Sequence, residues 1–157
     1  MSAAISFALT GPGAGAQGET LAAEGVRTGY DDVDAAAGAL RDGSADLVVG
    51  ALPFDLRRPA ALMAPLRVLH ALPERAGRTL PGVRIAETLP DPAGHRARVE
   101  RLLRRLRDPE DALQKVVLAR ALALVADDPV DSMTLLHRLV DADPEATGYL
   151  ADLSPAG

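Results

Sequence analysis

The clearest periodic pattern in the chain is an apolar stripe with helical spacing near residue 100. Val99, Leu102, Leu103 and Leu106 recur at intervals of three and four residues, which places them on one face of a helix. The pattern predicts a helix from Gly94 to Arg107, and the Asp-Pro dipeptide that follows predicts its end. Arginines fill most of the other positions, as on a solvated helix face. Nucleic-acid binding is the alternative, and it is disfavoured by an aromatic content of only 3%.

A second pattern alternates with the spacing of a β-strand, from Leu113 to Val125. In that strand, Lys115 shares one face with Val117 and three alanines, while large apolar side chains lie on the other face. The small side chains would leave space above Lys115, as a ligand-facing strand does. A helix is the alternative, because alanine and leucine favour helices and periodicity alone does not decide between the two.

Shorter apolar runs bounded by glycine and proline predict further strands. They extend from Ile5 to Leu9, Leu47 to Leu52, Val83 to Ile85 and Tyr149 to Leu153. The proline-punctuated stretch from Pro59 to Pro81 predicts irregular structure, with one short candidate strand from Leu66 to Leu69.

Two shorter helices are predicted from their capping signals. The first begins at Asp31 or Asp32 and runs through Leu40 to a stop at Gly43. The second is capped by Ser132, runs from Met133 to Val140 and ends before Pro144. Strands that alternate with helices in this way predict an α+β or α/β protein.

The composition is that of a single globular domain of 157 residues, with 48% hydrophobic and 25% charged residues. The net charge of -5 argues against general binding to nucleic acid or to an anionic membrane. No apolar run approaches the roughly 20 residues of a membrane span, and no basic region precedes the first apolar stretch as in a signal peptide. The absence of cysteine excludes disulfides and thiolate chemistry and fits a cytoplasmic protein.

Lys115 is the only lysine among 17 basic residues. Arginine stays protonated near neutral pH, whereas a buried lysine can lose its proton and act as a base. A lone lysine inside an apolar run is therefore a candidate for chemistry, although one lysine can also persist by chance.

Several patterns that suggest ligand sites have simpler interpretations. Gly13, Gly15 and Gly18 fit G-x-G-x-x-G, but no helix pattern opens directly after them, so a plain loop is predicted. The three histidines lack metal-site spacing, His137 is expected at the surface, and the aspartates at 31, 32 and 34 are interpreted as helix-start acids. No metal-ligating or cofactor-binding residue is therefore assigned.

Two segments carry a resemblance to a known family. Val-Val-Gly-Ala-Leu-Pro-Phe-Asp at 48–55, followed by Arg58-Pro59, resembles a segment of the isochorismate synthases. Gln-Lys-Val-Val-Leu-Ala-Arg at 114–120 resembles a strand of chorismate-using enzymes, with Ala119 where the family often has serine. A weaker match is Leu-Leu-His-Arg-Leu-Val at 135–140 with Pro144. The first segment favours isochorismate synthases of the siderophore type, which lead to 2,3-dihydroxybenzoate, over anthranilate and aminodeoxychorismate synthases.

The resemblance implies a fold, a reaction and a catalytic residue. Residues 1–157 would be the N-terminal part of a single chorismate-binding domain, an incomplete layered α/β sandwich of the anthranilate synthase component I type. Lys115 would be the base that activates water for attack on C2 of chorismate. A glutamate would protonate the departing C4 hydroxyl, and Mg²⁺ would hold the substrate carboxylate.

The family's acid glutamate lies in a Gly-Ala-Ser-Pro-Glu-Leu-Leu-like segment, and Ser154-Pro155 is not followed by glutamate. The acid and the magnesium ligands are therefore expected beyond this chain, which alone would be inactive. Uncovered strand edges and apolar faces are expected as well. A non-enzymatic binding module and a salicylate- or anthranilate-forming enzyme remain the alternatives, and the oligomeric state is left open.

Overall fold

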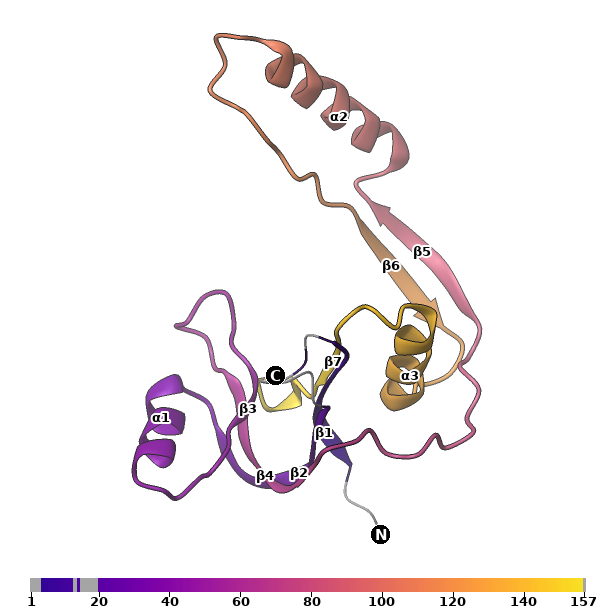
Figure 1. Ribbon diagram of the computed structural model, residues 1–157. Helices are drawn as coiled ribbons and strands as arrows, with labels where there is room; N and C mark the ends of the chain where they lie inside the picture. The colour runs from indigo at the N-terminus through magenta and orange to yellow at the C-terminus, as the bar shows by residue number, and fades with distance from the viewer. Residues whose placement is uncertain (1–3, 13, 15–19, 157) are drawn as a thin grey trace. The chain divides into compact units, whose positions relative to one another are not determined.

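The computed structural model describes residues 4–12, 14 and 20–156. The chain forms two compact units, one made of Met1–Leu80 with Asp131–Gly157 and the other of Pro81–Val130. They are called here the sheet unit and the ribbon unit. Figure 1 labels the helices and strands of each.

The sheet unit is built on five antiparallel strands in the order β3-β4-β2-β1-β7. The strands are β1 (Ile5–Thr10), β2 (Leu21–Tyr30), β3 (Val49–Ala51), β4 (Ala61–Leu69) and β7 (Gly148–Ala151). The predicted strands at the two ends of the chain are confirmed. The strand predicted from Leu47 to Leu52 is confirmed at its centre only.

The two central strands of this sheet depart most from the sequence prediction. No element was predicted for β2, and β4 begins five residues before the candidate strand at Leu66. Glu24 of β2 is only 4% exposed and lies directly opposite Arg67 of β4, with which it forms an ion pair. A glutamate and two glycines make the sequence of β2 resemble a loop. The arginine that stabilises the buried glutamate lies 43 residues further along the chain, so the local sequence gives no sign of it.

Small side chains fill the interior of the sheet unit. Alanines at 8, 22, 23 and 64 are fully buried, and Met63 is the largest side chain that is buried to the same degree among the described residues. Ala23, Val49 and Met63 form one cluster, and Ala8, Ala22 and Leu136 form another. The backbones can therefore approach closely, but the core contains few large apolar groups.

Two helices of the sheet unit begin at aspartate caps. α1 (Val33–Arg41) follows Asp32, whose Oδ1 accepts a 2.7 Å hydrogen bond from the backbone N–H of Ala35. α1 confirms the predicted helix and its stop, since Gly43 has a φ of +77°. α3 (Ser132–Ala142) is also confirmed, but its predicted cap is wrong: Asp131 accepts from Thr134 N at 2.8 Å, and Ser132 is already helical.

The ribbon unit contains β5 (Val83–Leu89), α2 (Pro92–Arg107) and β6 (Ala121–Ala126). β5 and β6 pair as a two-stranded antiparallel ribbon (Figure 1). α2 confirms the predicted helix, with Asp91 as its cap and two additional residues at its start. The strand predicted from Leu113 to Val125 is wrong in its first part, because residues 112–120 have no regular secondary structure.

No residue of the ribbon unit is buried. Alternation along β6 and its register with β5 place Val83, Ile85, Leu122 and Leu124 on one face of the ribbon. Ile85 is 59% exposed and Leu124, its cross-strand partner, is 58% exposed. The uncovered apolar faces expected from the sequence are thus present, and an isolated two-stranded ribbon is marginally stable in water.

The mixed strands and helices confirm the α+β class, while the specific layered sandwich and the single domain stay predictions. No helix in the described ranges is long and apolar enough to cross a membrane. η1 (Ser154–Ala156), a 3₁₀ turn, lies at the end of the described chain.

Separate alanine substitutions at Asp131 and Ser132 distinguish the observed cap of α3 from the predicted one. Asp131→Ala is expected to lower the free energy of unfolding of the sheet unit by about 1 kcal/mol, because one helix-end N–H loses its acceptor. Ser132→Ala should change the free energy of unfolding by only about 0.3 kcal/mol. Urea unfolding followed by circular dichroism measures both. Equal losses in the two variants would contradict the assignment of Asp131.

Removing the apolar pair on the ribbon tests whether that face is open in solution. The chain is expected to bind a hydrophobic dye such as bis-ANS and to self-associate. Ile85→Thr combined with Leu124→Thr should reduce the dye fluorescence, whereas Arg84→Thr on the opposite face should not. A monomeric chain with little dye binding would show that the face is covered.

Candidate functional site

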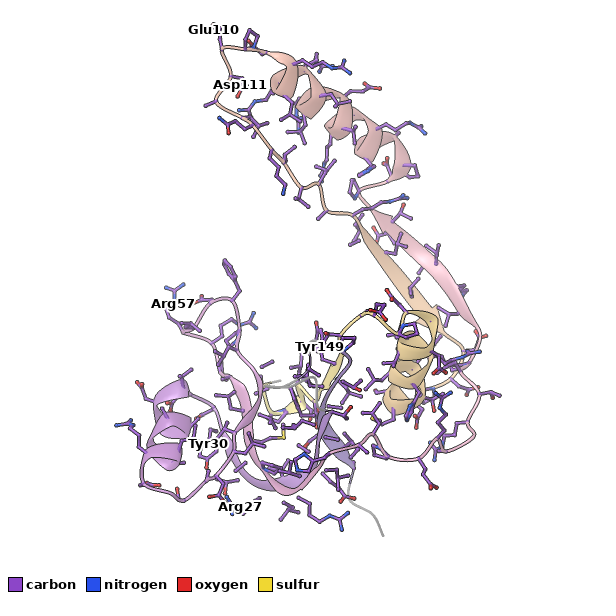
Figure 2. The ribbon with its side chains drawn as sticks, in the orientation of Figure 1. Arg27, Tyr30, Arg57, Glu110, Asp111 and Tyr149 are labelled. Atoms are coloured by element: carbon purple, nitrogen blue, oxygen red, sulfur yellow. The ribbon has the colours of Figure 1, made fainter. Side chains whose placement is uncertain are left out.

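Lys115 lies in the irregular segment between α2 and β6. The start of this segment is held by Asp111, which accepts two hydrogen bonds from Arg105 of α2, at 2.7 Å from Nε and 3.1 Å from Nη2. The same carboxylate accepts from the backbone N–H of Leu113 at 2.9 Å. Figure 2 shows Glu110 and Asp111 at the turn that follows α2. The segment is therefore anchored four residues before the lysine.

Asp111 is an anchor and not a proton donor. Its hydrogen bonds from Arg105 and from the backbone of Leu113 hold the pKa of the carboxyl below its ordinary value. Asp111 is consequently ionised at neutral pH, when a general acid would have to carry a proton.

The surroundings of Lys115 differ from the sequence prediction. Lys115 is exposed, Ala119 is exposed, and Val117 is 84% exposed. The apolar slot expected around the amine is not formed by this segment, because the segment is not paired into a sheet. The catalytic role of Lys115 stays a prediction.

In the segment at 48–55, β3 and β4 approach so closely that one position requires glycine. Gly50 of β3 has a φ of +137°, and an added Cβ would overlap the carbonyl oxygen of Ala61 on β4. Val49 beside it is buried against Ala23 and Met63. Glycine is thus required here to bring β3 against β4 and to position the loop that follows.

That loop is ordered by a local network around Asp55. The carboxylate accepts from Arg57 Nε at 2.9 Å, from Arg57 Nη2 at 2.8 Å and from the backbone N–H of Arg57 at 3.1 Å. These bonds, the side-chain bond above all, lower the pKa of Asp55. Phe54 is fully exposed, and Figure 2 shows Arg57 projecting from the loop. The loop therefore presents an aromatic ring and a cation outward.

A small pocket lies beside this loop. It has a volume of about 210 Å³ and is bounded by the end of β3, the loop, the start of β4 and the segment at 153–156. Arg58 is its charged member and the other lining residues are alanine, leucine and proline. The volume is below the roughly 300–1,000 Å³ typical of small-molecule sites, so the pocket would hold only part of a ligand.

The remaining candidates from the sequence do not assemble into a metal site. Within the described ranges, no three His, Asp or Glu side chains come together in a way that could hold a metal ion. His137 is half-buried, and not on the surface as predicted, because its Nε2 donates a hydrogen bond to the carbonyl of Pro73 at 3.0 Å. Gly13, Gly15 and Gly18 lie outside the described residues.

The two segments that resemble the isochorismate synthases therefore occur in different units. The segment at 48–55 and Arg58 belong to the sheet unit, and Lys115 belongs to the ribbon unit. Asp55 and Arg58 lie in the loop that follows β3, where the backbone N–H of Arg58 donates to the carbonyl of Asp55 at 3.0 Å. Sequence reasoning did not identify the Asp55–Arg57 pair, although a carboxylate two residues before an arginine in a turn is a recognisable signal.

Comparison with known proteins finds longer relatives that match this chain along most of its length. Two curated relatives from Mycobacterium tuberculosis, of strains CDC 1551 / Oshkosh and ATCC 25618 / H37Rv, are each 53% identical to this chain over 153 residues. The match covers 96% of this chain and 40% of each relative. Both carry the name "Putative isochorismate synthase MenF".

The resemblance to isochorismate synthases is thereby confirmed across almost the whole chain. The chain spans about two-fifths of the length of these relatives. No protein-family model matches the chain.

Two glycine substitutions test the close approach of β3 to β4. Gly50→Ala is expected to destabilise the sheet unit by at least about 1–3 kcal/mol, the range for a residue forced into a sparsely populated conformation. Gly38→Ala, inside α1 with open space around it, should stabilise the chain by about 0.5–1 kcal/mol. Urea unfolding of both variants is the measurement. A Gly50→Ala variant as stable as the parent would remove the structural reason given for this glycine.

Proposed function

We propose that this chain is the Lys115-containing part of an isochorismate synthase. The observation that carries the proposal is the 53% identity to two proteins of that name over 153 residues. The match includes almost the entire chain, and the two most specific segments, at 48–55 and 114–120, belong to different structural units. The expected α/β sandwich belongs to this same proposal.

In the proposed reaction, Lys115 acts as a general base. Its neutral amine takes a proton from water as the water oxygen bonds to C2 of chorismate. The ring double bond shifts, and the C4 hydroxyl leaves after receiving a proton from a separate acid. Water is added and water is lost, so the product is an isomer of the substrate. Mg²⁺, when bound, would stabilise the substrate carboxylate, and no described residue is assigned to it.

Such a mechanism requires a change in the surroundings of Lys115. A lysine works as a base near neutral pH when it is removed from water or placed near other cations. Lys115 is exposed, and the ribbon that follows it presents Ile85, Leu122 and Leu124 to solvent. We propose that polypeptide equivalent to the remaining three-fifths of the relatives covers the ribbon unit and supplies the acid.

A binding module without catalysis is the second candidate. The exposure of Lys115 and Val117 favours it, because neither side chain is held in an apolar site. A salicylate- or anthranilate-forming activity is a third product class. The siderophore pathway and a cytoplasmic location stay predictions.

The test is performed on a completed protein, in which this chain is fused to the remaining part of the M. tuberculosis relative. The fusion is expected to convert chorismate to isochorismate. The product is identified by chromatography. Lys115→Gln and Lys115→Arg should each reduce kcat by about 10²–10⁴-fold, because neither side chain can accept the proton. Gln114→Ala, one residue away and also exposed, is the control and should retain turnover.

Each alternative predicts a different result in the same assay. Full activity in Lys115→Gln would remove Lys115 from the mechanism. Full activity in Lys115→Arg alone would assign it a purely electrostatic role. A fusion that binds chorismate without turnover would support the binding module, and a salicylate or anthranilate product would support the third class.

A further inference from the structure

The segment that follows β4 is fastened to α3 at three places, all within the sheet unit. Pro73 accepts the hydrogen bond from His137, Arg75 makes a bidentate ion pair with Asp141 at 2.5 and 2.6 Å, and Arg78 contacts Asp131 at 3.3 Å. These contacts join residues 53 to 66 positions apart in the sequence. Figure 1 shows this stretch of chain passing beside α3.

A pocket of about 470 Å³ lies between the fastened segment and α3. Its size falls within the range of sites that take small organic molecules. Gly77, which has a φ of +63°, lets the segment turn around the opening. The polar contacts between the segment and α3 hold the two walls of the pocket in place.

The lining of the pocket is cationic. Arg75, Arg78 and Arg138 all border it, and only the first two are paired, Arg75 with Asp141 and Arg78 with Asp131. Three guanidinium groups thus face two carboxylates, which leaves one positive charge uncompensated. His137 also borders the pocket.

The three guanidinium groups are not equally available to a ligand. Arg75 uses two nitrogens on Asp141, whose pKa is lowered chiefly by the Arg75 bonds. Arg78 has only one long contact, and the guanidinium of Arg138 makes no ion pair or hydrogen bond among the described residues. Arg138 is therefore the free donor, with Arg78 as a second, and Thr79 also lines the pocket.

We propose that this pocket binds a small organic molecule through a carboxylate or phosphate group. A guanidinium matches the paired oxygens of both groups, and such charge-assisted bonds are the stronger kind. Leu80 and the carbon atoms of the arginine stems supply apolar surface for the remainder of the molecule. The proposal does not depend on the proposed function, since every residue that lines the pocket belongs to the sheet unit and Lys115 belongs to the ribbon unit.

The probes are benzoate and inorganic phosphate, added separately to the full chain and followed by NMR of backbone amides. Saturable shifts are expected at residues 77–80 and 134–138. Arg138→Gln should weaken binding about tenfold, the loss typical of one hydrogen bond to a charged group. Arg101→Gln, which removes an exposed arginine from α2, is the matched control and should bind within about twofold of the parent.

Tighter binding of benzoate would identify a carboxylate ligand, and tighter binding of phosphate would identify a phosphate ester. The proposal is overturned if neither probe gives saturable shifts at these residues. It is also overturned if Arg138→Gln, with an unchanged circular dichroism spectrum, binds both probes as the parent does, or if Arg101→Gln weakens binding equally.

Discussion

The sheet unit depends on the pairing of β2 with β4, the two strands at the centre of its sheet. That pairing requires burial of Glu24, which is permitted because Arg67 lies directly opposite and forms an ion pair with it. Removing Arg67 would take an ion-pair partner from a nearly buried carboxylate, a change that costs more than losing a fully exposed pair, whereas Arg67 itself is largely exposed. The position of β3, and with it the loop at 53–59, follows from β4.

The same sheet shows which features could be predicted from the sequence. α1 was predictable from its cap and α2 from its apolar stripe, because each of these signals lies within one short segment. β2 was not, because Glu24, Gly25 and Gly29 have low strand propensity and their compensation comes from distant residues. Tertiary pairing therefore overrides the local signal at the centre of the fold.

The error at residues 113–120 has a different cause. The alternating pattern is present, but a strand exists only where another strand pairs with it. β5 spans seven residues and pairs only with Ala121–Ala126, so nothing in the ribbon unit can pair with the segment that contains Lys115. Lys115 was identifiable as an unusual residue from composition alone. Its surroundings were not, since they depend on which strand lies beside it.

The exposed lysine and the exposed ribbon face both belong to a unit whose described strands form only a two-stranded sheet. Ile85, Leu122 and Leu124 lose the stabilisation that burial provides, about 25 cal/mol for each Å² of apolar surface removed from water. A surface that covered this face and paired with residues 113–120 would gain that energy. If residues 113–120 continued the alternation of β6 as a strand, Lys115 would share the face of Ala121 and Ala123, opposite Leu122 and Leu124. Covering the apolar face alone would thus leave the amine solvated, and desolvating the proposed base would require a second layer on the face of Ala121 and Ala123.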